Sequence, residues 1–236
     1  MRNVLTQKEF VEKYNAGQRE FTGVLMQFFD VSDMKLSDLA IKDSEILFCT
    51  FRNCDLKGAD IRNCRIYFLS FYTGTAKNIV FEKCDIELSL FDTFSFSSAK
   101  FSRCDIRWSG IMNSNHNTVD FSSSSLYKFF TDISQVTEQD LEHLIKLVGQ
   151  NVERLDIGLR LKVKEMMRQD IDRYNLSPPG EEGGAYDKKH GDYRDSPLTH
   201  GEIKGLIEGA FGAYGEQSPV YKNKKSVYEK TGKYKN

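Results

Sequence analysis

The chain has 236 residues, of which 39% are hydrophobic and 28% charged, and its 33 Lys and Arg residues balance its 34 Asp and Glu residues. This length allows one sizeable domain with appendages, and the even charge gives no reason to expect direct binding to nucleic acid. Because no run of 18 apolar residues occurs and the N-terminus lacks an apolar signal sequence, we expect no membrane span, a cytoplasmic location and reduced cysteines.

Residues 1–18 carry the signals of a short helix. Thr6 and Glu9 have the spacing of a capping box, and Gly17 is a typical stop residue. Between them, Phe10 and Tyr14 are four residues apart and therefore share one face of a helix. We predict a helix over residues 6–16 that covers the N-terminal end of the domain that follows.

Residues 19–132 repeat every five positions. In RNCDLKGADIRNCRI (52–66), a small residue, then usually a carboxylate, then a large residue recurs, followed by two variable positions. Counted in fives from Phe21, the central residue of each phrase is large and apolar except at Ala76 and His116. Neither a helix, with its period of 3.6, nor a strand, with its period of 2, gives this spacing. The central residues are Phe21, Met26, Val31, Leu36, Ile41, Ile46, Phe51, Leu56, Ile61, Ile66, Phe71, Ala76, Phe81, Ile86, Phe91, Phe96, Phe101, Ile106, Ile111, His116, Phe121 and Leu126.

A second period of 20 residues relates KDSEILFCTF (42–51), RNCRIYFLSF (62–71), EKCDIELSLF (82–91) and SRCDIRWSGI (102–111). Self-similarity at a fixed period is typical of solenoids. Over residues 19–130 the register resembles the pentapeptide-repeat family, whose phrase is Ala-(Asp/Asn)-Leu-x-x. The resemblance implies a mainly β fold, a right-handed quadrilateral β-helix in which each phrase forms one side and four phrases form one turn. About five coils would stack about 4.8 Å apart.

The cysteines of the repeat invite a metal-site hypothesis, which the pattern does not favour. They occupy the small position two residues before a central residue, where Cys serves as a compact hydrophobe. No His or second carboxylate is interleaved among them, so we expect no metal and no cofactor. His116 is open to a ligand or catalytic role, but a histidine with a polar partner near the end of the solenoid is favoured. The five cysteines are Cys49, Cys54, Cys64, Cys84 and Cys104.

Residues 133–175 are predicted to form a C-terminal cap. Thr137 is a candidate N-cap for an amphipathic helix that we expect to end at Gly149. Residues 155–163 then alternate like a strand, and residues 163–174 return to helical spacing. Either a short strand runs into a helix or one helix spans 152–174, and the first is slightly favoured.

Residues 176–236 are predicted to be an extension rather than part of the solenoid. Residues 176–197 are rich in Pro, Gly and charge and are interpreted as a linker or extended arm. Thr199 and Glu202 then have capping-box spacing, and glycines recur at every fourth position from Gly201, which permits close approach of another backbone. A basic, tyrosine-spaced tail follows from Ser218. The apolar stripe of this candidate docking helix is Ile203, Leu206, Ile207, Ala210, Phe211 and Tyr214.

One outward side of the predicted solenoid carries an apolar and aromatic stripe. Soluble monomers rarely leave such a patch bare. Two readings stay open: the protein's own C-terminal extension covers the stripe, or a partner or a second copy of the chain does. The stripe is Leu47, Phe48, Tyr67, Phe68, Leu88, Trp108 and Tyr127.

Three functional hypotheses follow, and the one we favour is a non-enzymatic interaction or structural module. In it, a rigid rod and a C-terminal arm dock into a larger assembly, for example of a bacterium or a phage. The second follows from the family resemblance. Some pentapeptide-repeat proteins resemble a DNA duplex in shape and charge, bind DNA gyrase and confer resistance to quinolones. That mimicry needs a strongly negative rod, whereas residues 1–132 contain 16 basic and 17 acidic residues.

The third hypothesis is an enzyme. His190, Asp192, Asp195 and His200 lie close together in the predicted linker and could be drawn as a metal cluster. Their spacing matches no established ligand pattern, and a linker preorganises a site poorly. We therefore do not expect an enzyme.

Overall fold

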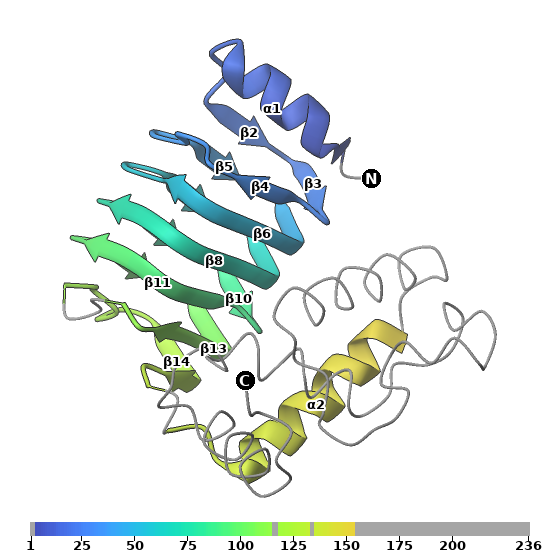
Figure 1. Cartoon of the computed structure of the whole chain (residues 1–236), viewed down its shortest axis with the longest axis vertical. Coiled ribbons are helices and arrows are strands. Elements are labelled where there is room, and N and C mark those ends of the chain that lie inside the picture. Colours follow the sequence, from blue (N-terminus) through green and yellow to red (C-terminus); the bar gives the residue numbers. More distant parts are fainter. Residues whose placement is uncertain (1–2, 115–117, 133–134, 154–236) are drawn as a thin grey trace, which may run out of the picture. The chain divides into compact units, whose positions relative to one another are not determined.

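The computed structural model describes residues 3–114, 118–132 and 135–153. The chain divides into two compact units, Met1–Asp132 and Ile133–Asn236. The first unit is the solenoid, and the described part of the second is one helix (Figure 1). No helix within the described ranges is long and apolar enough to cross a membrane.

The solenoid begins with a short strand and a capped helix. Strand β1 (Asn3–Leu5) leads into helix α1 (Gln7–Asn15). The Glu9 backbone N–H donates to Thr6 Oγ1 at 3.2 Å, and the Thr6 backbone N–H donates to Glu9 Oε2 at 2.9 Å, which completes the predicted capping box. Phe10 is fully buried, and its ring lies 5.1 Å from that of Phe21. The helix thus closes the N-terminal end of the core, as the sequence predicts.

Short parallel strands form the rest of the first unit (Figure 1). In the described part, nine lie in one sheet, ordered β1-β3-β6-β8-β10-β13-β11 with β4 on β6 and β14 on β13, and five lie in a second, ordered β12-β9-β7-β5-β2. The strands after β1 are β2 (Glu20–Thr22), β3 (Val24–Gln27), β4 (Asp30–Ser32), β5 (Ala40–Lys42), β6 (Glu45–Asp55), β7 (Asp60–Arg62), β8 (Arg65–Lys77), β9 (Val80–Glu82), β10 (Asp85–Glu87), β11 (Leu90–Ser97), β12 (Lys100–Ser102), β13 (Asp105–Met112) and β14 (Ser125–Phe130).

The strand register confirms the 20-residue period. Ile86 of β10 pairs with Ile66 on one side and with Ile106 on the other, so equivalent phrases stack directly. The chain makes about six turns of a parallel β-solenoid, rather than the five expected. Strand β1, which no sequence pattern predicted, extends the first sheet by pairing Leu5 with Met26. The mainly β quadrilateral helix predicted from the sequence is thereby confirmed.

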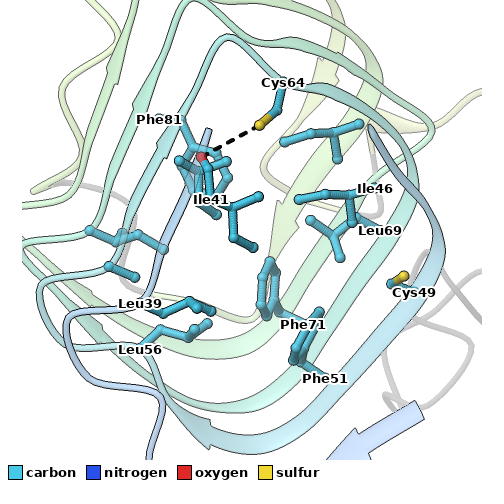
Figure 2. Close-up of a cluster of buried hydrophobic side chains, with 14 of the residues drawn as sticks. Leu39, Ile41, Ile46, Cys49, Phe51, Leu56, Cys64, Leu69, Phe71 and Phe81 are labelled. Carbon is cyan, nitrogen blue, oxygen red and sulfur yellow. Dashed lines mark hydrogen bonds between the residues drawn. The ribbon is translucent and has the colours of Figure 1, made fainter. Parts of the chain in front are cut away.

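The central residues from Phe21 to Ile111 fill the solenoid interior (Figure 2). In the last coil the prediction fails, because Phe121 is only partly buried and Leu126 is 44% exposed. The rings of the central residues stack from coil to coil: the centroids of Phe51 and Phe71 lie 5.3 Å apart, and those of Phe81 and Phe101 lie 4.6 Å apart. The undersized Ala76 pairs with Phe96, and Gly74 pairs with Phe94. Both phenylalanines are buried, so they supply the volume that Ala76 lacks.

Each coil turns its corners at a residue with left-handed backbone conformation. This residue lies two positions after the central residue of the phrase and has a φ between 48° and 60°. Because L-residues with side chains rarely adopt this conformation, the corner positions constrain the sequence as strongly as the core does. The non-glycine corner residues are Phe28, Asp33, Asp38, Asp43, Phe48, Asn53, Asn63, Phe68, Thr73, Asn78, Lys83, Leu88, Ser98, Arg103, Trp108, Asn113 and Lys128.

In the second unit, helix α2 spans Glu138–Glu153. The Asp140 backbone N–H donates to Thr137 Oγ1 at 3.1 Å, so the predicted N-cap is present. The predicted end at Gly149 is wrong, because the helix continues for another turn. A glycine inside a helix costs about 1 kcal/mol relative to alanine and does not by itself end it.

That α2 caps the solenoid stays a prediction. The predictions for His116, for residues 155–174 and for the extension 176–236 lie outside the described residues.

The core register predicts that Ile86→Asp unfolds the solenoid. Ile86 is fully buried between two equivalent isoleucines, and an unpaired carboxylate there has no partner. We expect loss of the cooperative transition in urea, followed by circular dichroism. The control Ile86→Val should lower stability by only about 0.5–1.5 kcal/mol. An Ile86→Asp chain with unchanged melting would show that the register is wrong.

The tight packing at Gly74 predicts a second sensitive position. Gly74 has φ +132°, and an added Cβ would lie 2.4 Å from the Cys54 carbonyl oxygen and 2.8 Å from the Phe94 ring. Gly74→Ala should therefore lower the free energy of unfolding by at least about 2 kcal/mol. The matched control is Gly23→Ala, where φ is +67° and nothing lies within 4 Å, so only the left-handed backbone costs about 1–2 kcal/mol. Equal losses in the two variants would contradict this account.

Candidate interaction surface

One of the four corners of the solenoid differs chemically from the other three. At three corners the left-handed residues are polar or small: for example Asp33 and Asn53 at one, Asp38 and Gly58 at another, and Asp43 at the third. At the fourth corner, which follows the strand segments of Met26, Ile46, Ile66, Ile86 and Ile106, they are bulky and apolar, and only the last coil has a charged residue there, Lys128. We call this set the aromatic corner; it consists of Phe28, Phe48, Phe68, Leu88 and Trp108.

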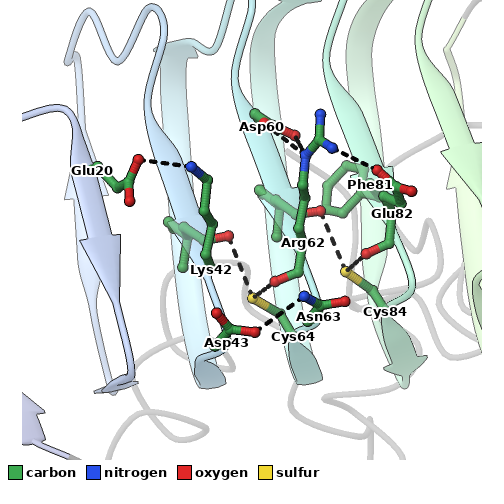
Figure 3. Close-up of polar contacts among 12 residues, drawn as sticks. Glu20, Lys42, Asp43, Asp60, Arg62, Asn63, Cys64, Phe81, Glu82 and Cys84 are labelled. Atoms are coloured by element: carbon green, nitrogen blue, oxygen red, sulfur yellow. Dashed lines mark hydrogen bonds and ion pairs between the residues drawn. The ribbon is translucent and has the colours of Figure 1, made fainter.

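The aromatic corner is an unfavourable choice for the backbone. A left-handed conformation costs a residue with a side chain roughly 1–2 kcal/mol, and Asn and Asp tolerate it best. At the polar corners the side chains also bond from coil to coil: Asn63 Nδ2 donates to Asp43 Oδ1 at 3.0 Å (Figure 3), and Asn53 Nδ2 donates to Asp33 Oδ1 at 2.7 Å. Phenylalanine, leucine and tryptophan have neither advantage, so apolar contact must offset their strain.

The rings of the aromatic corner form a ladder along the solenoid. Phe48 stacks on Phe28 and on Phe68, with both centroid distances at 5.6 Å. Tyr67 packs its edge against Phe48 at 5.4 Å, and Tyr127 packs against Trp108 at 5.9 Å. The Lys128 ammonium lies 5.9 Å from the centroid of the Trp108 ring, which is a cation–π distance.

Four of the five residues of the aromatic corner are buried although they are not part of the core, and Phe28 is half-buried. Phe48, Phe68, Leu88 and Trp108 are 4%, 9%, 6% and 7% exposed. None of them belongs to the contiguous core cluster. The polar left-handed residues at the other corners are exposed, apart from the half-buried Gly58 and Gly23. Three neighbouring outward residues are also buried outside the core cluster: Leu90, Met112 and Phe130.

The structure brings the residues of the predicted stripe together on this corner. Tyr67 is buried with the ladder, Leu47 is half-buried, and Tyr127 at the last coil is 56% exposed. Sequence reasoning missed Phe28, although it stands 20 residues before Phe48 in the same register. It also missed Leu90, Met112 and Phe130, which lie on the adjoining side.

The charged side chains of the solenoid pair with one another. Lys42 Nζ lies 2.7 Å from Glu20 Oε2, and this hydrogen bond lowers the pKa of Glu20. Arg62 bridges Asp60 and Glu82 at 2.7 Å each (Figure 3), and Arg103 also contacts Glu82. The ion pairs leave the outward faces with both signs interspersed rather than with one dominant sign.

Arginines on two other sides of the solenoid also pair with carboxylates. Arg107 contacts Asp85 at 2.7 Å and also pairs with Asp105. Arg52 pairs with Asp30, and its guanidinium lies 5.8 Å from the centroid of the Tyr72 ring. Basic groups are therefore part of the surface on several sides of the rod, which is the opposite of a uniformly negative duplex mimic.

The cysteines are buried thiols whose hydrogens go to backbone carbonyls. Cys64 Sγ donates to the Ile41 carbonyl at 3.5 Å (Figure 2), and Cys84 Sγ donates to the Ile61 carbonyl at 3.4 Å. Burial raises the pKa of Cys49 to about 12. A hydrogen bond with Cys84 lowers the pKa of Cys104. In the described part of the chain, no group of three or more His, Cys, Asp or Glu residues could hold a metal ion. The linker residues His190, Asp192, Asp195 and His200 lie outside it.

Comparison with known proteins gives likeness at the level of fold. No family model matches the sequence, and no curated protein matches it. A structure of a trypsin-treated variant of QnrB1, a plasmid-mediated fluoroquinolone resistance protein, matches at 16% identity and a TM-score of 0.39 over 46% of this chain. The match spans 53% of that QnrB1 chain, about half its length. Full-length QnrB1 matches at 12% identity and a TM-score of 0.23, over 53% of this chain and 99% of that one.

Rfr23, a pentapeptide-repeat protein from the cyanobacterium Cyanothece 51142, matches at 8% identity and a TM-score of 0.32. The match covers 52% of this chain and 92% of Rfr23. At these identities and scores, the likeness carries no argument about binding partners.

The thiol environment predicts that the native protein resists alkylation and disulfide reagents. At pH 8 we expect release of no more than about one thiol equivalent with a chromogenic disulfide reagent, and of all five once the chain is unfolded in urea. Because the folded pKa of Cys49 lies above its unfolded value, its contribution to stability is complete below about pH 8.5 and is lost as the pH rises towards 12. Rapid native release of several equivalents would contradict the burial.

Proposed function

By its five-residue register and its four-sided solenoid the chain is a pentapeptide-repeat protein, and from that premise we propose that it is a non-enzymatic interaction module. The solenoid presents the aromatic corner as a docking surface for another protein, and the C-terminal extension serves as an arm within a larger assembly. The single observation that carries this proposal is the aromatic corner: bulky apolar residues in left-handed conformation, outside the core, in a register where the other corners use polar residues or glycine.

Two properties make this corner suitable for protein binding. Its edge residues Phe28, Leu47 and Tyr127 are half-buried or exposed, and its aromatic side chains have few rotatable bonds, as those of interface hot spots do. Its ladder is held by the strands on both sides, so the surface is preorganised and little conformational entropy is lost on binding.

DNA mimicry of the kind that binds gyrase is not the function that we propose. It would require a dense negative field along the rod. Here Arg62, Arg103 and Arg107 alternate with their carboxylate partners, and such a surface has no net field to match a duplex.

The proposal predicts that replacing two phenylalanines of the aromatic corner abolishes partner binding without unfolding the solenoid. We would replace Phe48 and Phe68 by Asn, which suits the left-handed backbone. Circular dichroism should still show a folded β-protein, whereas capture of specific proteins from native lysate by the tagged full chain should fall at least about tenfold, because hot-spot side chains each contribute about 2 kcal/mol or more.

The matched control is Lys83→Asn, which introduces the same residue at the same backbone conformation on a polar corner. It should leave the captured proteins unchanged. Identical capture by the wild type and the double Asn variant would refute the proposed docking surface. Capture of a type II topoisomerase by every variant would instead support the gyrase hypothesis.

A further inference from the structure

Three of the buried cysteines stand in one column of the solenoid, which we call the thiol ladder: Cys64, Cys84 and Cys104. The Asp85 backbone N–H donates to the Cys64 carbonyl at 3.0 Å, and the Asp105 backbone N–H donates to the Cys84 carbonyl at 2.9 Å. Asp85 and Asp105, which follow two of these cysteines, are also paired in register. The three side chains therefore stack at the spacing of paired strands, about 4.8 Å.

The three sulfur atoms of the thiol ladder have equivalent surroundings. Each cysteine is no more than 3% exposed. Each sulfur lies within 3.5 Å of two carbonyl oxygens, one two residues earlier in the chain and one in the preceding coil. Figure 3 shows Cys64 and Cys84 in equivalent positions of adjacent coils. Hydrogen bonding with the side chains of Cys104 and Cys64 raises the pKa of Cys84. The ladder is thus a straight row of neighbouring thiols.

The spacing of this row matches a metal ion held in line between two sulfur atoms. A bond between a transition metal and a thiolate sulfur is about 2.3 Å long, so a linear S–metal–S unit spans about 4.6 Å. Side chains of strands stand roughly perpendicular to the sheet, so each Cβ–Sγ bond makes nearly a right angle with the row. A thiolate binds a metal at an angle close to this one.

The same geometry selects the kind of ion. Soft closed-shell cations such as Cu⁺ prefer sulfur ligands and accept two of them in a line. Zn²⁺ instead takes four ligands arranged as a tetrahedron. Among the described residues no group of three or more His, Cys, Asp or Glu converges in that way. The lack of interleaved His or carboxylates therefore argues against zinc but not against a two-coordinate ion.

We propose that the thiol ladder binds one soft monovalent cation of the Cu⁺ type, in line between Cys84 and either Cys64 or Cys104. On binding, two S–H bonds break, two S–metal bonds form and two protons pass to the solvent, and no electron is transferred. One ion binds at a time, because both positions need the Cys84 sulfur. The site is separate from the aromatic corner and does not depend on the function proposed for it.

Two other cysteines are internal controls for the thiol ladder. Cys49 and Cys54 are as deeply buried, and each of their sulfur atoms lies within 3.7 Å of two carbonyl oxygens. In the next coil, however, Cys49 pairs with Leu69 and Cys54 pairs with Gly74. The residues 20 positions earlier are not cysteines either. Burial is therefore common to all five cysteines, whereas a stacked neighbouring thiol is confined to the ladder.

The test is a titration of the reduced, full-length protein with Cu⁺, without oxygen and in competition with a chromogenic chelator. Because the thiols are buried, the ion enters through local opening of the coils, and each point is followed to equilibrium. The wild type should bind one ion. Cys84→Ser should lower the affinity at least about a hundredfold, more than the loss of an outer-shell partner does, because it leaves Cys64 and Cys104 two coils apart, about 9.6 Å.

The matched control is Cys49→Ser, which removes an equally buried thiol and should leave the affinity unchanged. Both variants should fold, as checked by circular dichroism, because serine already occupies this inward slot elsewhere: Ser109 Oγ donates to the Arg107 carbonyl at 2.8 Å. Wild-type affinity in Cys84→Ser, or an equal loss in Cys49→Ser, would overturn the proposal.

A gain of binding tests the linear geometry itself. Ser44 stands one coil before Cys64 in the same column, since the Arg65 backbone N–H donates to the Ser44 carbonyl at 3.1 Å. Ser44→Cys lengthens the row to four thiols, which can form two separate pairs, so the stoichiometry should rise from one Cu⁺ to two. X-ray absorption of the wild-type complex should show two sulfur neighbours. An unchanged stoichiometry, or a metal with three or four ligands, would overturn the proposed site.

Discussion

The left-handed residue at every fifth position is the constraint on which the rest of this structure depends. It turns the chain by one corner, between strands or within longer strands such as β6 and β8, and returns the next central residue to the interior. Because four such turns close one coil, equivalent residues stack 20 positions apart and the strands pair in parallel register. The core ladders of isoleucine and phenylalanine, the thiols bonded to carbonyls of the preceding coil and the paired surface charges all follow from that repeat.

The sequence predicts the core well because burial imposes one requirement on each central residue. Ile46, Ile66, Ile86 and Ile106 can be placed by counting in fives, and the structure stacks them accordingly. Even the exception at Ala76 is readable, since Phe94 and Phe96 are oversized one coil later. The two ends of the described chain are harder to predict from the sequence. Strand β1 lies outside the five-residue repeat, and Gly149 is a residue type that often ends a helix but does not end α2.

The candidate site could be predicted only in part, for a physical reason. Outward positions carry no common burial requirement, so their residue types reveal a stripe but not its backbone. Nothing in the local sequence suggests that Phe48, Phe68 and Trp108 adopt positive φ, because aromatic residues are among those that avoid it. Once the corner geometry is known, Phe28 joins the ladder and Leu47 and Tyr127 become its edges. The composition signalled an apolar surface, and the fold shows that the surface is strained.

That strain limits what the aromatic corner can be. Five bulky left-handed residues at roughly 1–2 kcal/mol each amount to several kcal/mol, comparable with the net stability of a domain. Stacking between neighbouring rings stabilises the corner by about 0.5–1.5 kcal/mol per pair, which is too little by itself to offset the backbone strain. Burial of the apolar side chains, at about 1.5–3 kcal/mol each, is large enough to offset the strain. A partner protein that binds the corner of the folded solenoid, and not the unfolded chain, also stabilises the solenoid. Partner binding and the stability of the solenoid are therefore thermodynamically linked.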